Sequence, residues 1–522
     1  MTKTLTHTSA RGVSKYSLYL ILIFIALAFM LLLRASTPYG SGLINDSIAY
    51  VAGARSILAG TGYSEIWLAS ELEPITHYPP LFPLVLAFVG LFGVDPLAGA
   101  RAVNILLFGA NIILIGILGW KIFKNQFMSV LLALLFAVNG ALFRIHSYAL
   151  SEPAFLFFCL SSFLILQFYL AGNGSRILLF ALGVIVGMAI LDRYAGLALF
   201  GTIAFALFLL EPTWRSRIQA WMVFLGGSIP LPLAWLIYNT QLTGFAADRS
   251  LSWHPVTTDN LLLGVTNFSN WLIPLGQFEA QRRVIDLLGT LLLFIIGLGL
   301  LVWLVAGAIR MLRDSSGESQ QNPIVYVAGA FTWIYILSVL ASISLFDPTT
   351  KFQDRILVPA YLSLLIVLVA FIWWIWRLNG SAARIVAALV SLLILGLWSR
   401  DLYQVVSSLR QDGEGYASRR IRESSVIKFV NSLPSDIAIY TDSPPSIYSG
   451  TERPSFVVFV NMDNSSYLLS INKEIKAGHA ILVLFDTQSY GDSVSNANYR
   501  RLTEGAMMIA RFGRQRAFMG EE

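Results

Sequence analysis

The chain has 522 residues, of which 56% are hydrophobic and only 13% are charged, and its formal net charge is +6. Because ordinary soluble domains carry about 25% charged residues, this composition excludes a soluble globular protein and requires a lipid bilayer to solvate most of the chain. The one cysteine, Cys159, excludes a disulfide framework and a cysteine-based zinc site.

Charge is distributed unevenly along the chain, with a change near Arg400. Residues 401–522 carry 13 Lys and Arg and 14 Asp and Glu, so about one residue in five is charged. The first 400 residues carry 23 basic and 16 acidic residues, about one in ten. We therefore expect a membrane domain over residues 1–400 and a soluble domain over residues 401–522.

Eleven apolar runs in the membrane domain approach the 17 to 25 residues or so that a spanning helix needs, which predicts an all-α polytopic fold. The run Leu81–Gly93 is shorter and follows Pro79-Pro80, so we expect a helix at the interface rather than a span. In chain order the eleven runs are Ser17–Leu33, Leu97–Trp120, Phe127–Leu142, Tyr148–Leu170, Ile177–Leu191, Tyr194–Leu210, Ile218–Tyr238, Leu287–Ile309, Ile324–Phe346, Ile356–Trp376 and Ile385–Trp398.

The distribution of basic residues predicts the orientation of the chain, because short cytoplasmic loops collect Lys and Arg. With eleven spans and a cytoplasmic N-terminus, the cytoplasmic segments hold twelve Lys and Arg against three Asp and Glu. The C-terminal domain is then extracytoplasmic, as are two long loops, residues 34–95 and 239–286. The first run lacks a small-residue cleavage site and is expected to be retained. We expect function on this outer face, since long loops usually carry it.

The first outer loop opens with Asp46, the first acidic residue of the chain. Apolar and small residues recur after it at helical spacing, at Ile48, Ala52 and Ile57. This pattern predicts an amphipathic helix along the membrane surface, with Asn45 or Asp46 capping its N-terminus. By itself the pattern gives Asp46 only this structural role.

Four further motifs follow Asp46 in order. They are Gly60-Thr-Gly62-Tyr63, His77-Tyr78-Pro79-Pro80-Leu-Phe-Pro83, Ser151-Glu152-Pro153 and Asp354-Arg355-Ile-Leu-Val-Pro359. Each is weak alone, but the set in this order resembles the GT-C fold membrane glycosyltransferases. The resemblance is to the bacterial polyprenyl-phosphate-sugar-dependent enzymes related to protein mannosyltransferases and the lipid A aminoarabinose transferase, and it covers about residues 15–400.

The resemblance implies a fold, a donor and a catalytic residue. It implies that Asp46 is the general base that takes the proton of the acceptor hydroxyl, that the donor is a polyprenyl-phosphate sugar, and that the C-terminal domain is extracytoplasmic. Relatives often carry an acidic or basic residue where this chain has His77 and Tyr78. A metal or phosphate role at those two residues is therefore an open question.

Transfer from a lipid-linked phosphate also needs positive charge to stabilise the leaving phosphate. Charged side chains near membrane depth are costly and are functional candidates, which favours Arg193 and Arg355 as donor-phosphate ligands, with Lys351 and Arg144 on the same side. The alternative for each of these residues is a structural role at a helix end, in which the side chain extends along the membrane to place its charge in water. Glu152 is either a site residue or a favourable charge in a first helical turn.

Two histidines could act with these acidic residues as ligands of a divalent cation. His77 and His146 could join Asp46 or Glu73, because imidazole and carboxylate groups both bind such ions. The sequence fixes no ligand spacing, so the cofactor stays open, with Asp46 and His77 as the ligands if an ion binds.

The second outer loop is rich in aromatic residues. These suit either stacking on sugar rings or an aromatic belt at the membrane interface. They are Trp253, His254, Phe268, Trp271 and Phe278.

The tail alternates short apolar runs with amphipathic segments, which predicts a small α/β domain with a partly parallel sheet. No phosphate-binding loop, nucleophile elbow or metal spacing occurs in it, and its basic end suits a solvated face rather than a nucleic-acid partner. The predicted helices are residues 425–433, 467–477 and 499–512, the strands are 437–440, 456–460 and 480–485, and residues 443–450 form a loop.

These features together predict an inverting glycosyltransferase, of hexosyl or pentosyl type. It would move a sugar from the lipid carrier to a lipid, glycan or protein acceptor at the outer face of the cell membrane. The alternative is a transporter or flippase of a lipid-linked substrate. Transporters tend to show internal repeats, and the sequence shows none.

Overall fold

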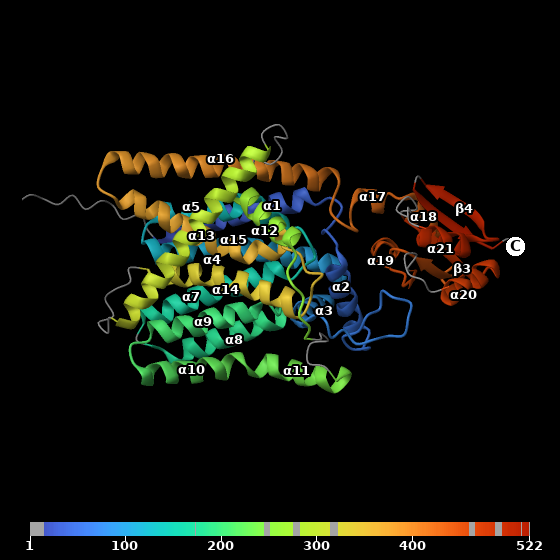
Figure 1. Ribbon diagram of the computed structural model, residues 1–522, viewed down its shortest axis with the longest axis horizontal. Helices are drawn as coiled ribbons and strands as arrows, with labels where there is room; N and C mark the ends of the chain where they lie inside the picture. Colours follow the sequence, from blue (N-terminus) through green and yellow to red (C-terminus); the bar gives the residue numbers. More distant parts are fainter. Residues whose placement is uncertain are drawn as a thin grey trace, which may run out of the picture.

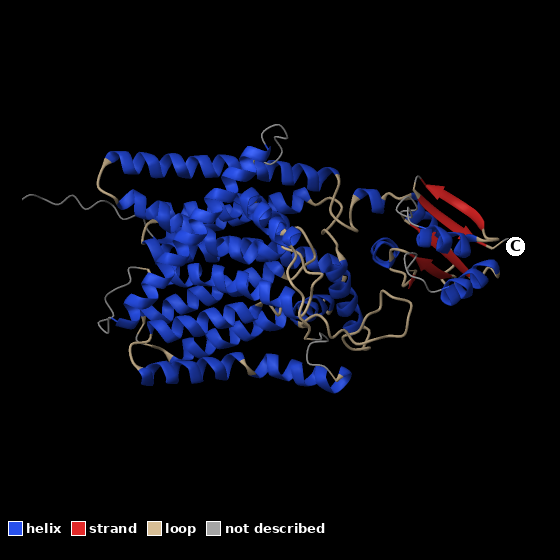
Figure 2. Cartoon of the chain, viewed as in Figure 1, coloured by secondary structure: helices blue, strands red, loops and turns tan. Residues whose placement is uncertain are grey.

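The computed structural model describes residues 15–172, 174–244, 251–274, 282–313, 322–458, 465–485, 493–512 and 514–520. These residues form a helical bundle and, beyond one of its ends, a small domain around a five-stranded sheet (Figures 1 and 2). The predicted fold class, a polytopic helical domain followed by a small α/β domain, is confirmed.

Seven helices among the described residues are long and apolar enough to cross a membrane, and two bent helix pairs raise the number to as many as nine. The chain is therefore a multi-pass membrane protein. The seven are α1 (Lys15–Ser36), α4 (Pro96–Phe123), α7 (Glu152–Ala171), α13 (Arg282–Arg313), α14 (Pro323–Leu345), α15 (Asp354–Arg377) and α16 (Ser381–Gln411). The bent pairs are α5 (Gln126–Val138) with α6 (Gly140–His146), and α10 (Trp214–Ser228) with α11 (Pro230–Thr243).

Two of the eleven predicted spans, α8 (Arg176–Asp192) and α9 (Gly196–Leu210), are short helices. They have 17 and 15 residues, at or just below the lower end of the roughly 17 to 25 residues of a spanning helix. The turn between them is tight, and a Cβ at Gly196 would lie only 2.6 Å from the backbone of Ala189. All eleven predicted runs coincide with a helix or a bent pair.

Helices α8 and α10 pack backbone against backbone. A Cβ at Gly187 would lie 2.8 Å from the carbonyl oxygen of Ser228. A Cβ at Gly183 or Gly227 would likewise lie too close to the backbone of the other helix. Small residues that let helices approach this closely are typical of membrane bundles, where apolar burial cannot drive helix association.

The loop of residues 34–95 contains two helices, α2 (Asn45–Leu58) and the ten-residue α3 (Leu81–Gly90). A helix thus follows Asp46 as predicted, but it is not an amphipathic surface helix, since residues 47–54 are all buried, and the predicted cap is wrong. The N-cap is Ile44, whose backbone N–H donates to the Ser47 hydroxyl at 3.2 Å. Because the Ser47 hydroxyl makes the capping hydrogen bond, the Asp46 carboxylate remains available for other partners.

Helix α16 runs past the predicted boundary at Arg400 and ends at Gln411, close to the sheet domain (Figure 1). The sheet has the order β2-β1-β3-β5-β4, with β1 parallel to β2 and β3, and β5 antiparallel to β3 and β4. Its strands are β1 (Ala438–Thr441), β2 (Phe456–Val457), β3 (Ala480–Leu484), β4 (Met507–Phe512) and β5 (Gln515–Met519). The helices of this part are α17 (Arg419–Arg422), α18 (Ser425–Ser432), α19 (Pro444–Thr451), α20 (Ser465–Lys476) and α21 (Ser493–Thr503).

Two predictions for the tail are wrong. The helix expected over residues 499–512 ends at Thr503, and a turn with Gly505 at φ +66° leads into β4, which pairs with β5. The loop expected over residues 443–450 is instead α19, which begins at Pro444, a residue preorganised for a first helical turn.

The sheet domain docks onto the loop of residues 34–95. Arg55 of α2 binds Glu452 at 2.8 Å and the Tyr448 hydroxyl at 3.0 Å, and also binds Asp95 in its own half of the chain. Leu68 forms an isolated β-bridge with Ser455. The C-terminal domain therefore lies directly against the helix that carries Asp46.

Candidate active site

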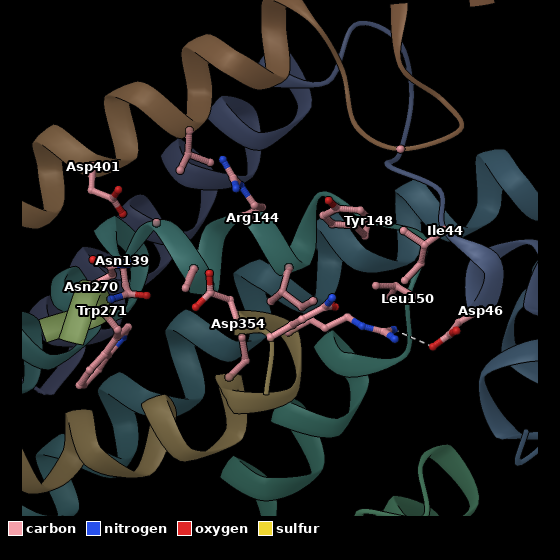
Figure 3. Close-up of a pocket in the computed structure, with 18 of the residues that line it drawn as sticks. Ile44, Asp46, Asn139, Arg144, Tyr148, Leu150, Asn270, Trp271, Asp354 and Asp401 are labelled. Carbon is pink, nitrogen blue, oxygen red and sulfur yellow. Dashed lines mark hydrogen bonds and ion pairs between the residues drawn. The ribbon is translucent and has the colours of Figure 1, made fainter. Parts of the chain in front are cut away.

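An ion pair between Asp46 and Arg355 lies at the centre of the candidate site. Arg355 Nη1, from the first turn of α15, lies 2.7 Å from Asp46 Oδ2 in the first turn of α2 (Figure 3). The Tyr78 hydroxyl donates to the other oxygen, Asp46 Oδ1, at 3.1 Å. Both carboxylate oxygens are thus held by side chains from distant parts of the sequence.

A second acid–base pair lies behind the first. Glu152 Oε1, in the first turn of α7, is 2.9 Å from Arg193 Nη1 and 3.9 Å from Arg355 Nη1. The Glu152 side chain is only 1% exposed, and Arg193 also donates to the Ser151 hydroxyl at 3.1 Å. Arg193 pairs with Glu152 rather than with its neighbour Asp192, the partner that adjacency suggests. Acidic and basic groups therefore alternate through the network.

Burial and charge act in opposite directions on the Asp46 carboxyl. Burial raises its pKa, but the charge and hydrogen bond of Arg355, the charge of Arg193 and the Tyr78 hydrogen bond outweigh burial, and the pKa lies below its ordinary value. The pKa of Tyr78 is raised by burial and by the adjacent Asp46 charge. Asp46 is therefore ionised and Tyr78 is a hydrogen-bond donor at neutral pH.

A cavity of about 770 Å³ opens beside the ion pair. Figure 3 shows Asp46 at one end and Asp354, Asp401 and Trp271 towards the other, with Arg144 between them. Its walls come from α2, α6, α15, α16 and the end of α12 (Thr258–Leu272). A cavity of this size accommodates a small organic ligand.

The segment that leads into α2 is held on both sides. On one side Gly42 N–H donates to the Ser147 carbonyl and the Gly42 carbonyl accepts from Ala149 N–H, each at 2.9 Å. On the other side the Leu43 carbonyl accepts from Tyr416 N–H at 2.8 Å. The link between α16 and the sheet domain thus fixes the residues directly before Asp46.

The structure brings together most of the predicted site residues. Asp46, Arg355, Glu152, Arg193 and Tyr78 form the network described above. Arg144 lines the cavity, and its Nε lies 3.5 Å from Glu414 Oε1.

Other predicted residues lie elsewhere. The Lys351 and Glu73 residues are exposed and do not line the cavity. His146 is buried, with Nδ1 2.6 Å from the Leu142 carbonyl and Nε2 3.1 Å from the Asn111 amide. His77 packs edge-on against the Tyr78 ring.

The sequence leaves a divalent cation open, and the part of the chain that the structure describes shows no ligand set for one. There, no three His, Cys, Asp or Glu side chains converge as metal ligands. Asp46 uses its two oxygens for Arg355 and Tyr78.

The sequence prediction missed several cavity residues. Asp354 stands inside the motif that revealed Arg355, and its position next to that arginine was the available signal. Asp401 was assigned to the soluble domain, whereas it belongs to α16 and lines the cavity. Of the aromatic residues in loop 239–286, Trp271 lines the cavity and Trp253 is exposed, while Phe278 lies outside the described residues.

Comparison with known proteins identifies the fold. A family model described as dolichyl-phosphate-mannose-protein mannosyltransferase matches residues 69–243, and no curated protein matches the sequence. Among solved structures, ArnT from Cupriavidus metallidurans bound to undecaprenyl phosphate superposes with a TM-score of 0.62 at 13% identity, covering 97% of this chain and 98% of that one. The oligosaccharyltransferase of Archaeoglobus fulgidus superposes with a TM-score of 0.56 at 11% identity, covering 98% and 75%. The chain therefore has the GT-C fold.

Proposed function

We propose that this chain, which has the GT-C fold over nearly its whole length, is an inverting glycosyltransferase. It takes a sugar from a polyprenyl-phosphate carrier and delivers it to a hydroxyl of a lipid, glycan or protein at the outer face of the membrane. The family match and the likeness to a structure that holds undecaprenyl phosphate support this proposal. The observation that carries it is the Asp46–Arg355 ion pair beside a ligand-sized cavity.

The proposed reaction is a single displacement. The acceptor oxygen attacks the anomeric carbon of the donor while the bond from that carbon to the phosphate oxygen breaks, and the polyprenyl phosphate leaves with the electron pair. Asp46 accepts the proton of the acceptor hydroxyl, a task that suits an ionised carboxylate in a partly buried site. One displacement inverts the configuration at the anomeric carbon.

Arg355 serves two anions in turn. In the structure its Nη1 binds Asp46, and this contact holds the Asp46 pKa low, which makes the carboxylate a weak base. A donor phosphate in the cavity competes for the same guanidinium, which can grip phosphate oxygens through two N–H groups. Donor binding therefore loosens the ion pair and strengthens Asp46 as a base when the acceptor proton must leave.

Glu152 and Arg193 hold this arrangement in place from behind. The buried Glu152 carboxylate lies near both arginines, so it offsets their mutual repulsion and keeps Arg355 directed towards the cavity end that holds Asp46. Arg193 adds positive potential behind the phosphate without lining the cavity itself. Fixed charges directed at developing charge are a major source of rate enhancement in enzymes.

Transfer by the purified full-length chain in lipid nanodiscs tests the proposal. The probes are undecaprenyl phosphates that carry single neutral sugars, with a membrane lipid extract or a methyl glycoside as acceptor, and release of undecaprenyl phosphate is measured. We expect Asp46→Asn to lower the rate at least about 100-fold, the typical contribution of a general base. Asp259→Asn, which changes an exposed residue in the first turn of α12, is the matched control.

Full activity in Asp46→Asn, or no transfer by the wild type with any donor, contradicts the proposal. A flux assay in liposomes separates the transporter alternative. Translocation of a lipid-linked sugar that persists in Asp46→Asn, without transfer in either protein, favours a transporter.

A further inference from the structure

The end of the cavity away from Asp46 has a lining of its own. Figure 3 shows Asn139, Asn270, Trp271, Asp354 and Asp401 gathered there, contributed by the α5–α6 break, α12, α15 and α16. These side chains take no part in the ion-pair network at the other end. Carboxyl and amide groups thus line one end of the same cavity, beside the Trp271 ring.

The Asp401 carboxyl in this lining has no hydrogen-bond or ion-pair partner among the described residues. It is half-buried and lines the cavity. Asp354 uses Oδ1 to accept a hydrogen bond from Tyr361 at 3.0 Å. The indole N–H of Trp271 also lacks an acceptor, but it has no accessible surface and is closed off from the cavity. A carboxyl that no protein group pairs can accept hydrogen bonds from an occupant.

The break between α5 and α6 makes room for these groups. The two helices meet at 63°, and the Asn139 side chain caps α6 by accepting from Leu142 N–H at 3.1 Å. The next residue is Gly140, and a Cβ there would collide with the Asp401 carboxyl. Glycine therefore lets the carboxyl lie against the start of α6 at the cavity wall.

The mixture of groups indicates the class of occupant. Each hydroxyl of a sugar both donates and accepts a hydrogen bond, so a sugar ring can satisfy carboxyl acceptors and amide donors together. An anionic ligand would face Asp354 and Asp401. Of the two cations in the lining, Arg144 is paired with Glu414 and Arg355 with Asp46. The lining thus favours neutral rings and disfavours anionic ones.

We propose that this end of the cavity is a subsite for a neutral, hydroxyl-rich monosaccharide ring and that Asp401 is its main specificity-determining residue. The proposal rests on the proposed glycosyltransferase function. The ring belongs either to the donor or to the acceptor, since both must reach Asp46 from within the cavity. Asp401 and Asp354 accept hydrogen bonds from ring hydroxyls, and Asn270 pairs with a further hydroxyl.

Binding measurements on the full-length protein in nanodiscs test the subsite. The probes are bare undecaprenyl phosphate, undecaprenyl-phosphate glucose, undecaprenyl-phosphate glucuronic acid and free methyl glucoside. We expect Asp401→Asn to weaken binding of one of the two glucose-bearing probes about tenfold, as fits loss of a hydrogen bond to a charged group, and to leave bare undecaprenyl phosphate unaffected. The probe that weakens identifies the ring as donor or acceptor.

Selectivity gives a second readout. If the ring belongs to the donor, the wild type should bind the glucose carrier more tightly than the glucuronic acid carrier, and Asp401→Asn should narrow that difference in affinity. If it belongs to the acceptor, the same should hold for methyl glucoside compared with methyl glucuronide. Asn270→Ala should weaken the same probe as Asp401→Asn, which guards against a folding defect in one variant. Asp436→Asn, an exposed change in the C-terminal domain, should change none of these affinities.

Three results overturn the subsite while leaving the proposed function standing. One is a wild type that still transfers sugar, binds bare and glycosylated carriers equally and does not bind methyl glucoside. Another is an equal loss of affinity for all probes in Asp401→Asn. The third is binding of the glucuronic acid carrier as tight as that of the glucose carrier although Asp401→Asn weakens binding of the glucose carrier. Failure of the wild type to bind any carrier or to transfer overturns the proposed function itself, and the subsite with it.

Discussion

The hydroxyl of Tyr416, in the link between α16 and the sheet domain, donates a 2.7 Å hydrogen bond to the side-chain oxygen of Asn45, the residue before Asp46. A second contact supports this one, because the Tyr148 hydroxyl donates to Glu414 at 2.9 Å across the same segment. The start of α2 is therefore enclosed by groups from the membrane domain and from the link. The position of the proposed base depends on both.

Gly415 gives the sharpest test of this enclosure. It has φ +59°, and a Cβ there would collide with the Leu43 carbonyl, three residues before Asp46. We expect Gly415→Ala to lower kcat about 10- to 100-fold, because displacement of a catalytic group by about 1 Å costs that much.

Gly478→Ala is the matched control for this change. Gly478 has a similar φ of +72°, but no heavy atom would meet its Cβ within 4 Å. Both variants carry the backbone strain of about 1 kcal/mol of a left-handed alanine, so both should lose a little thermal stability. Equal kcat values for the two variants would show that the link does not position Asp46.

The pair between Glu152 and Arg193 should contribute more to stability than a surface pair of the same length. Glu152→Gln leaves Arg193 buried without its counter-charge, a change that destabilises by about 3–5 kcal/mol in typical buried pairs. We expect a fall of several degrees in Tm and a loss of transfer activity, measured by thermal unfolding in detergent and by the nanodisc assay.

Glu423→Gln provides the comparison. Its partner Arg419 also lies at 2.9 Å, but both side chains are more than half exposed. Exposed pairs rarely contribute measurably, so Tm should not change. A similar Tm for the two glutamine variants would show that the Glu152–Arg193 pair contributes no more to stability than an exposed pair.

Several site residues could be predicted because a charge in apolar surroundings is conspicuous in a sequence. Glu152, Arg193 and Arg355 each stand at the edge of a long apolar run, where ionised groups are disfavoured. Their mutual contacts were not readable, since Asp46 and Arg355 are 309 positions apart and only the packed bundle brings them together. Lys351 stands at a similar place in the sequence, and only the structure shows it exposed.

Composition does not predict where a helix continues beyond its apolar sequence. The apolar run that predicted α16 ends at Trp398, so Asp401 was assigned to the soluble domain, although hydrogen bonding carries the helix to Gln411. The run Met507–Phe512 fits a helix or a strand equally well by its pattern. Its pairing with β5, a contact between segments, decides for the strand.

Tyr78 should tune the proposed base without being essential to the fold. Tyr78→Phe keeps the ring packed edge-on against Tyr50, 5.3 Å between centroids, and removes only the hydrogen bond to Asp46. Loss of one such bond is worth about 1 kcal/mol, so we expect kcat/KM to fall roughly fivefold with little change in Tm. Tyr63→Phe, which removes a hydroxyl that bonds the Tyr78 carbonyl at 3.4 Å, should behave like the wild type. An unchanged kcat/KM in Tyr78→Phe would exclude a role for this hydroxyl in the reaction.

The pH dependence of Arg355→Gln separates the two effects that act on Asp46. In the wild type, burial raises the pKa of Asp46, and Arg355 together with Arg193 and Tyr78 more than reverses that rise, so the carboxylate stays ionised to below its ordinary range. The kcat/KM of the wild type, which reports the free enzyme, should therefore stay flat as the pH falls through the mildly acidic range. In Arg355→Gln the attraction between Arg355 and Asp46 is lost while burial remains, so the pKa of Asp46 rises and kcat/KM should decline at a higher pH than in the wild type.

The ionised Asp46 should also stabilise the folded wild type at pH values above the ordinary carboxyl pKa. This contribution to the free energy of unfolding is lost as the pH falls through the lower pKa of Asp46 in the folded protein. Parallel profiles for the two proteins, after scaling to their neutral-pH rates, would mean that Asp46 is not the titrating base.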